Sequence, residues 1–287
     1  MNPYHRLVSE LDRLLREGRH YPLGGLPSPA RPELTPDAPR ILIFSPHPDD
    51  ECIIGGLALR LLREAGMRVL NVAVTQGSRK DRQAARWREL QAACDYLGFD
   101  LIATGPSGLE RVSPVTRRDD PGHWDRSVET IAAIIGDERP DVVFFPHDTD
   151  WNSTHVGTHQ LLIDALGRQP ATFSPLVVET EFWGAMASPN LMIELSVDDV
   201  ARMITALSFH VGEVQRNPYH LLVPPWMQDN VRRGSELVGG QGGGAPEFSF
   251  CTLYRLRRWR DGGLQPLYQG GRIVAAEANA AQALAAS

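Results

Sequence analysis

The segment that most constrains this chain is Ile41 to Glu51, ILIFSPHPDDE, where an apolar run passes directly into a histidine, two aspartates and a glutamate. A short continuous apolar run is typical of a strand buried on both faces of a parallel sheet. Pro46 and Pro48 end this strand, because neither offers a backbone N–H. Apolar residues at near-helical spacing continue to Ala65. The sequence therefore predicts a strand, a tight turn and a helix, and in an open α/β sheet such turns bind ligands.

Strands and helices alternate after this unit. The alternation predicts an α/β fold with a mostly parallel sheet and helices on both of its faces. Right-handed crossovers would bring several strand ends to one edge of that sheet. Strands are predicted over residues 68–75, 100–104, 141–146 and 176–183, and helices over residues 81–97, 125–135 and 154–166.

The flanking regions are less regular. A helix is expected over residues 5–17, before a proline-rich strap, so residues 1–39 are interpreted as an N-terminal extension. Residues 40–190 are expected to form the core. Residues 191–287 are expected to be a smaller irregular C-terminal part of the same domain, containing a Gly-rich loop at 239–244 that is either mobile or a lid.

Charge and cysteine content exclude several classes of protein. The 287 residues carry a formal net charge of -6, which argues against a general nucleic-acid surface, since duplex binding relies on clustered cations. The three cysteines are too few and too scattered for a disulfide framework. The N-terminus is charged throughout, and no apolar run reaches the ~18 residues of a membrane span. We therefore expect a cytoplasmic protein without a membrane partner.

The turn after the first strand has the residues of a metal site. His47 and Asp50 lie three positions apart and can converge on one ion, and imidazole and carboxylate are ordinary zinc ligands. Asp49, between them, can face a metal-bound water and accept its proton. Glu51 is interpreted as a first-turn residue favoured by the helix dipole. Helix capping alone would explain one aspartate but not the whole acidic cluster.

A catalytic zinc ion takes three protein ligands and leaves one position open. The missing ligand is expected at another strand end, and the segment after DVVFFP is rich in suitable side chains. His155 lies in the first turn of the next predicted helix, nearest the sheet edge, and is predicted to be the third ligand. His159, one turn further along the same face, is expected to orient a carboxylate or a neighbouring ligand. The candidates in this segment are His147, Asp148, Asp150, His155 and His159.

A set of motifs spanning roughly Arg40 to Leu166 resembles the PIG-L-type (LmbE-like) zinc-dependent N-acetylglucosaminyl deacetylases; the C-terminal third is similar more loosely. The motifs are PHPDDE after a buried strand, Gly55-Gly56, Thr75-x-Gly77, Arg86-x-x-Glu89 running to Leu97-Gly98, and the His-bearing segment after DVVFFP. The resemblance implies a Rossmann-like, three-layer sandwich. It also implies one Zn²⁺ per chain on His47, Asp50 and His155, with other divalent cations compatible, and Asp49 as general base.

The same resemblance implies a hydrolase of carbon–nitrogen bonds other than peptide bonds. Such an enzyme would remove an N-acetyl or other N-acyl group from a small-molecule amino sugar or its conjugate. Arg86 is then placed near the sugar. Trp151, beside the predicted site, is suited to stacking on a sugar ring, and a homo-oligomer is compatible with the sequence.

The chain departs from the family pattern at one position. Many relatives have HPDH in the second segment, where the first histidine is thought to stabilise the oxyanion or donate a proton. The matching stretch here is Asn152-Ser153-Thr154-His155. An amide can donate a hydrogen bond to an oxyanion but cannot supply a proton at neutral pH. Proton delivery would fall to Asp49 acting twice, or to His210 or His220.

Three questions stay open at this level. Arg79, Lys80, Arg82 and the pair Arg232-Arg233 would suit an anionic group on the substrate, but exposed charge runs are usually a solvated basic surface. An amidase acting on another N-acyl compound or a thiol conjugate is an alternative that keeps the metal. A non-catalytic Rossmann-like binding module is disfavoured, because acidic residues replace the Gly-rich turn that would hold a pyrophosphate.

Overall fold

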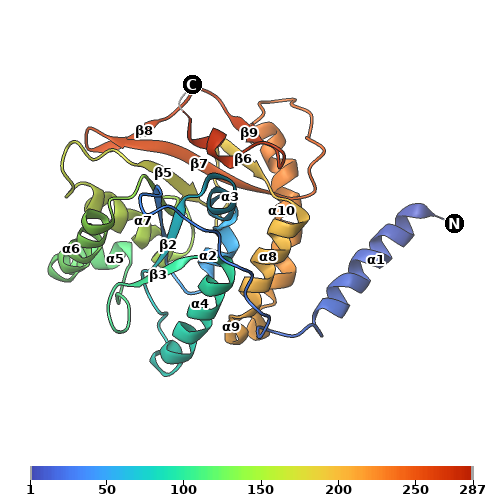
Figure 1. The fold of residues 1–287 in the computed structure, drawn as a ribbon, viewed down its shortest axis with the longest axis horizontal. Helices are drawn as coiled ribbons and strands as arrows, with labels where there is room; N and C mark the ends of the chain where they lie inside the picture. Colours follow the sequence, from blue (N-terminus) through green and yellow to red (C-terminus); the bar gives the residue numbers. More distant parts are fainter. Residues whose placement is uncertain (1, 286–287) are drawn as a thin grey trace.

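A mixed nine-stranded sheet forms the centre of the molecule, with the strand order β3-β2-β1-β4-β5-β7-β6-β9 and β8 paired to β7 (Figure 1). The computed structural model describes residues 2–285. Met1, Ala286 and Ser287, which belong to the predicted terminal regions, lie outside the described residues. The predicted mostly parallel sheet with helices on both faces is confirmed. The five parallel strands are β1 (Arg40–Ser45), β2 (Arg68–Ala73), β3 (Asp100–Ala103), β4 (Val142–Pro146) and β5 (Leu176–Thr180).

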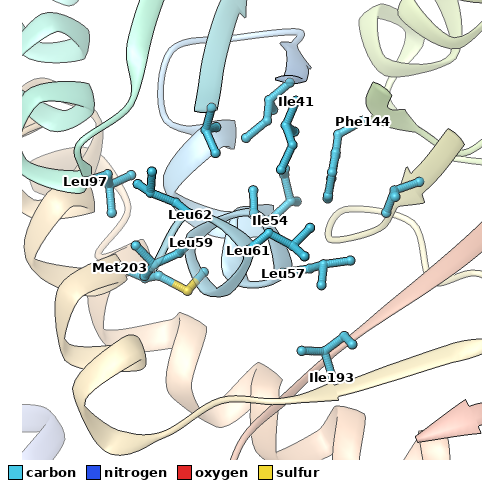
Figure 2. Packing of buried hydrophobic residues seen from close by; sticks show 14 of the residues in the cluster. Ile41, Ile54, Leu57, Leu59, Leu61, Leu62, Leu97, Phe144, Ile193 and Met203 are labelled. Atoms are coloured by element: carbon cyan, nitrogen blue, oxygen red, sulfur yellow. The ribbon is translucent and has the colours of Figure 1, made fainter. Parts of the chain in front are cut away.

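The two faces of β1 build two separate apolar layers. Ile41 and Ile43 point into one cluster, whereas Leu42 and Phe44 point into the other, as the period of two in a strand requires. All four side chains are buried, so the continuous apolar run in the sequence corresponds to a strand that is covered on both faces. Figure 2 shows the first layer, in which side chains of α3 such as Leu57 face the sheet.

Helices cover both faces as the alternation predicted. The predicted helix after β1 is divided at Gly55 into α2 and α3. Helix α5 lies between the predicted strand 100–104 and the predicted helix 125–135, where no helix was predicted. α5 begins at the N-cap Ser113, followed by a proline at the first helical position, which pre-sets the backbone angle. On one side lie α2 (Asp50–Ile54), α3 (Gly56–Ala65), the 3₁₀ helix η1 (Lys80–Arg82) and α4 (Gln83–Leu97), and on the other α5 (Pro114–Asp119), α6 (Pro121–Glu138) and α7 (Ser153–Leu166).

The C-terminal part extends the same sheet. β7 runs antiparallel to both β5 and β6, and α8 packs beside α3 and α4. The long helix α10 was not predicted, because Pro224 and Pro225 lie inside it and proline normally interrupts a helix. The proposed division into residues 1–39, 40–190 and 191–287 stays a prediction. The elements are β6 (Leu191–Glu194), α8 (Val197–Ser208), α9 (Val211–Arg216), α10 (Tyr219–Leu237), β7 (Cys251–Arg260), β8 (Gly263–Pro266), β9 (Arg272–Val274) and the 3₁₀ helix η2 (Ala280–Leu284).

The N-terminal helix α1 (Pro3–Gly18) extends away from the rest of the molecule (Figure 1). Its apolar side chains are exposed, whereas its polar face is joined by ion pairs such as Arg13 with Glu10 and Glu17. Among the residues that the structure describes, no helix is both long enough and apolar enough to cross a membrane.

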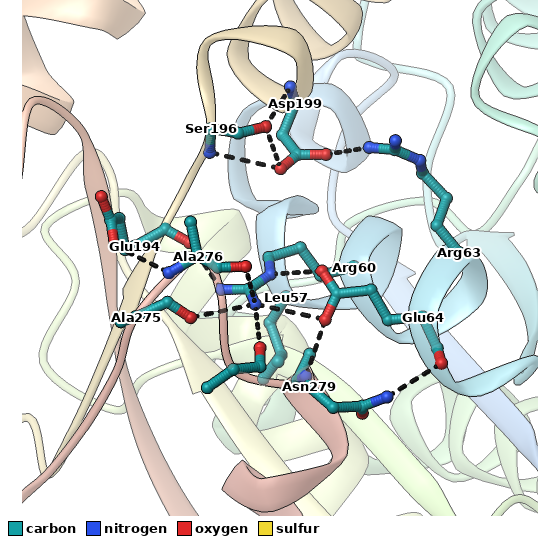
Figure 3. Close-up of polar contacts among 12 residues, drawn as sticks. Leu57, Arg60, Arg63, Glu64, Glu194, Ser196, Asp199, Ala275, Ala276 and Asn279 are labelled. Atoms are coloured by element: carbon teal, nitrogen blue, oxygen red, sulfur yellow. Dashed lines mark hydrogen bonds and ion pairs between the residues drawn. The ribbon is translucent and has the colours of Figure 1, made fainter.

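A buried arginine ties the C-terminal segment to α3 (Figure 3). The side chain of Arg60 is 1% exposed and pairs with Glu64 at 2.7 Å. Its guanidinium also donates to the backbone oxygens of Glu194, Ala275, Ala276 and Ala278. One cation therefore donates to four backbone carbonyl groups, from the end of β6 and from the segment that follows β9.

Replacing this arginine is expected to destabilise the fold. Arg60→Ala should lower the free energy of unfolding by about 3 kcal/mol, because several buried acceptors lose a charged donor at once. Urea denaturation would measure the change. The exposed pair of Arg68 with Asp100 provides the control, and Arg68→Ala should cost less than about 1 kcal/mol. Equal losses in the two variants would contradict the role given to Arg60.

Candidate active site

The candidate site lies where the strand order changes direction. β1 is hydrogen-bonded on one side to β2 and on the other to β4, so the turns that follow β1 and β4 meet at the same edge. The first turn contains Pro46 and Pro48, and α2 begins at Asp50. The second turn ends at Asn152, the N-cap of α7, whose side-chain oxygen accepts from the backbone N–H of Thr154.

His47, Asp50 and His155 converge as predicted. One potential ligand atom from each lies within 4.8 Å of the others. Asp50 Oδ2 is 3.5 Å from His47 Nδ1 and 3.4 Å from His155 Nε2. His155 Nε2 is buried and has no hydrogen-bond partner among residues 2–285, which is unusual for a polar atom unless a ligand completes its environment. The residues therefore fit a divalent cation such as Zn²⁺.

The charged groups of this cluster shift one another's pKa values. Burial would raise the pKa of Asp50, but His155 and His47 hold that pKa far below its ordinary value. Burial would likewise lower the pKa of His155, but Asp50 and Asp150 raise it to about 10. Asp150 Oδ2 lies 3.3 Å from His155 Nδ1, the ring nitrogen that does not face Asp50. Asp150 is thereby placed to orient the imidazole, a role that the sequence pattern did not predict.

Asp49 lies beside the cluster at the edge of a cavity. Its carboxyl group is buried, and both the burial and the neighbouring Asp50 raise its pKa, whereas His210 and Arg86 act in the opposite direction. Its backbone has a φ of 117°, which is unusual for a residue with a side chain. A carboxylate with a raised pKa beside a metal site is suited to accepting a proton.

Glu51 is in the first turn of α2, as expected, but its environment differs from that of an exposed helix start. The side chain is 0% exposed, and its Oε1 is 2.8 Å from Nε2 of the equally buried His210. Burial would lower the pKa of His210, but the carboxylates of Glu51 and Asp49 raise it above its ordinary value. No sequence pattern indicates this pair, because its members are far apart in the chain.

A cavity of about 650 Å³ opens over Asp49 and His47. One part of its wall is aromatic: Trp151 and Trp183 meet edge to face, as do Trp183 and Tyr219. Trp151 is 72% exposed, and its indole Nε1 donates to the backbone oxygen of Trp183 at 2.7 Å. Charged side chains complete the wall, namely Lys80, Arg86, Glu110, Arg111, Glu213 and Arg216.

The predicted substrate residues divide into two groups. Arg86 and Trp151 line the cavity, whereas His210 and His220, which were also expected near the substrate, do not. Asn152, predicted as a catalytic residue, lines the cavity as well. His210 is occupied by Glu51, and His220 lies in α10 with its pKa lowered by burial. Direct contact of either histidine with a substrate is therefore not supported by the geometry.

The predicted supporting residues also have identifiable partners. His159 has its Nδ1 at 3.0 Å from the backbone oxygen of Pro146 and at 3.7 Å from Glu179, so it braces the end of β4 without contacting the metal triad. Of the basic residues proposed for an anion, Lys80 lines the cavity, whereas Arg233 pairs with buried Glu181. The Gly-rich loop 239–244 is not among the cavity-lining residues, so the geometry does not favour a lid there.

The chain is similar in sequence or fold to several known proteins. The model of the PIG-L family, described as GlcNAc-PI de-N-acetylase, matches residues 42–166 and confirms the predicted resemblance. A curated relative is the 1D-myo-inositol 2-acetamido-2-deoxy-alpha-D-glucopyranoside deacetylase of Thermobifida fusca (strain YX). It is 27% identical over 195 residues, which cover 57% of this chain. The match spans 66% of that relative, slightly less than two thirds of its length.

Two solved structures have a similar fold. The N,N'-diacetylchitobiose deacetylase from Pyrococcus horikoshii is 17% identical with a TM-score of 0.54, and the match covers 89% of this chain and 93% of that one. The 4-carboxy-2-hydroxymuconate hydratase from Pseudomonas putida KT2440 is 18% identical with a TM-score of 0.52, covering 76% and 95%. These likenesses show the shared fold alone, and the reaction must be argued from the site.

Metal binding should release a proton from His155. Because the pKa of His155 is raised to about 10, its imidazole is protonated at pH 7 in the metal-free protein and must lose that proton to become a ligand. Calorimetric titration with Zn²⁺ in buffers of different ionisation enthalpy should show about one proton released per ion. His20→Gln, which changes an exposed histidine, is the control and should leave the number of released protons unchanged. Zinc binding without proton release would contradict the raised pKa of His155 in the metal-free protein.

The backbone of Asp49 should be strained. Asp49→Gly and Asp49→Ala both remove the carboxyl group, but only glycine adopts a φ of 117° readily. The glycine variant should therefore be more stable than the alanine variant by about 1 kcal/mol in urea denaturation of the metal-free protein. An alanine variant as stable as the glycine variant would show that this conformation stores no strain.

Proposed function

Because residues 42–166 form a PIG-L family domain, we propose that this protein is a metal-dependent hydrolase that removes an N-acetyl group from an amino sugar or an amino-sugar conjugate. The observation that carries the proposal is the convergence of His47, Asp50 and His155 next to Asp49, where His47 and Asp49 line one cavity. We propose one Zn²⁺ per chain on these three side chains. A cytoplasmic location and a homo-oligomer stay predictions.

The proposed reaction divides the work between the cation and the protein. When bound, a divalent cation polarises the amide carbonyl and lowers the pKa of a coordinated water. Asp49 removes the proton from the attacking water, because its carboxylate lies beside the triad and its pKa is raised. Attack on the carbonyl carbon gives a tetrahedral oxyanion, and cleavage of the C–N bond yields acetate and the free amine.

Asn152 is suited to a supporting role in this reaction. Its side-chain oxygen is fixed by the N–H of Thr154, which leaves the amide nitrogen as its hydrogen-bond donor. We propose that this nitrogen stabilises the oxyanion. An amide supplies no proton, and neither His210 nor His220 lines the cavity. Asp49 is therefore the best candidate to return the proton to the leaving amine.

The aromatic wall supports a sugar as the substrate. The ring of Trp151 is exposed but held in place by its bond to Trp183, so little side-chain freedom is lost when a ligand stacks on it. The cavity is also large enough for a conjugated sugar. We propose that the sugar ring stacks on Trp151 while its N-acyl group faces Asp49. An amidase acting on another N-acyl compound or a thiol conjugate is the alternative.

Asp49→Asn tests the proposed chemistry. The variant should bind Zn²⁺ with wild-type stoichiometry and lose about 10²- to 10⁴-fold in kcat, because the amide cannot accept the proton. Release of acetate from a panel of N-acetyl amino sugars and other N-acyl amides would be measured for both proteins. Full activity in the zinc-loaded variant would overturn the role of Asp49. Hydrolysis confined to amides that lack a sugar would favour the alternative substrate class.

A further inference from the structure

One peptide group beside the candidate site is held at both ends. The backbone oxygen of Pro48 accepts a hydrogen bond from the guanidinium of Arg86 at 3.1 Å. The backbone N–H of Asp49 donates to Glu51 Oε2 at 3.0 Å. These are the oxygen and the nitrogen of the same peptide unit, so its plane is fixed by a cation on one side and a carboxylate on the other.

This peptide plane determines the unusual conformation of Asp49. The angle φ measures rotation of the preceding peptide unit about the N–Cα bond of Asp49, and its value of 117° is disfavoured for any residue with a Cβ. Such an angle persists only where the surroundings impose it. The two hydrogen bonds supply that restraint, and they act in a buried region where charged partners bind strongly.

Both side chains of the clamp are anchored by one region of the chain. His210, the N-cap residue of α9, lies 2.8 Å from Glu51 Oε1, and both side chains are fully buried. Glu213, in the first turn of α9, lies 3.7 Å from Arg86 Nε, and the Arg86 side chain is only 13% exposed. The start of α9 therefore supports the Pro48–Asp49 peptide from two directions.

We propose that Glu51 and Arg86 are positioning residues that hold Asp49 in its strained conformation, and that His210 and Glu213 anchor them. The inference rests on the proposed function, in which Asp49 accepts the proton of the attacking water. It also assigns Arg86, which the sequence placed near the sugar, to the orientation of the general base. A displacement of about 1 Å at such a group can cost ~10²-fold in rate.

Two kinds of measurement separate positioning from other roles. The first is hydrogen exchange of the Asp49 amide in the metal-free protein, followed by NMR. The amide should exchange about tenfold faster in Glu51→Ala than in the wild type, with Glu51→Gln intermediate, because glutamine keeps one acceptor oxygen. The second is steady-state kinetics normalised to bound zinc. Glu51→Ala and Arg86→Ala should each lower kcat about tenfold or more, with KM and zinc affinity unchanged within about threefold.

Asp199→Asn provides the matched control. Asp199 is also a buried carboxylate with a basic partner, here Arg63, but it caps α8 and does not line the cavity. Its replacement should lower stability while leaving the Asp49 amide and kcat unchanged. If Glu51→Ala does not fold, Glu51→Gln and Arg86→Ala carry the same tests.

Three outcomes would overturn the proposal. Unchanged exchange of the Asp49 amide in the Glu51 variants would show that no clamp exists. A higher KM with unchanged kcat in Arg86→Ala would assign that residue to substrate contact. Loss of zinc in the Glu51 variants would assign Glu51 to the metal site. Absence of hydrolysis by the wild type would instead count against the proposed function, and the exchange experiment would still decide whether the clamp exists.

Discussion

Three consecutive carboxylates, Asp49, Asp50 and Glu51, are buried at the end of the central strand β1, and much of the surrounding structure follows from this constraint. Adjacent buried anions repel one another strongly unless each is offset by a cation. Asp50 faces two histidines, and Glu51 faces a third. Asp49 has no direct ion pair within the part of the chain that the structure describes, and it lies at the cavity, in the field of Arg86 and His210. The carboxylate that is least compensated is therefore the one best suited to accept a proton.

Each compensating group comes from a different part of the chain. His155 is delivered by α7, which follows β4, the neighbour of β1 on the side opposite β2. His210 is delivered by the junction of α8 and α9, long after the parallel strands have ended. The C-terminal part of the chain thus contributes to the site through electrostatic support as well as through the cavity wall. This explains physically why the β1 turn cannot be understood from the N-terminal half alone.

The sequence predicted those features that local patterns encode. The apolar run of β1, the prolines of the turn and the spacing of His47 and Asp50 place candidate metal ligands at a strand end, and the structure brings them together with His155. The partner of Glu51 left no such pattern, because His210 is an isolated histidine whose role depends on tertiary packing. α10 was missed for a related reason, since packing overrides the usual effect of Pro224 and Pro225 in a helix. The sequence offered Asp150 as a candidate, but only the three-dimensional arrangement places it beside His155 Nδ1.

The buried charges at the end of β1 are better explained by function than by stability. Replacing buried ion pairs by well-packed apolar residues is often neutral or stabilising, so the cluster around β1 is not explained by stability. A left-handed aspartate and orphaned imidazole nitrogens are further local costs in the same place. Unfavourable backbone angles and unsatisfied buried polar groups occur mainly at functional sites, where the rest of the fold offsets the lost stability. Here the apolar layers on both faces of β1 supply that stability, and the strained turn at its end is where the chemistry is expected.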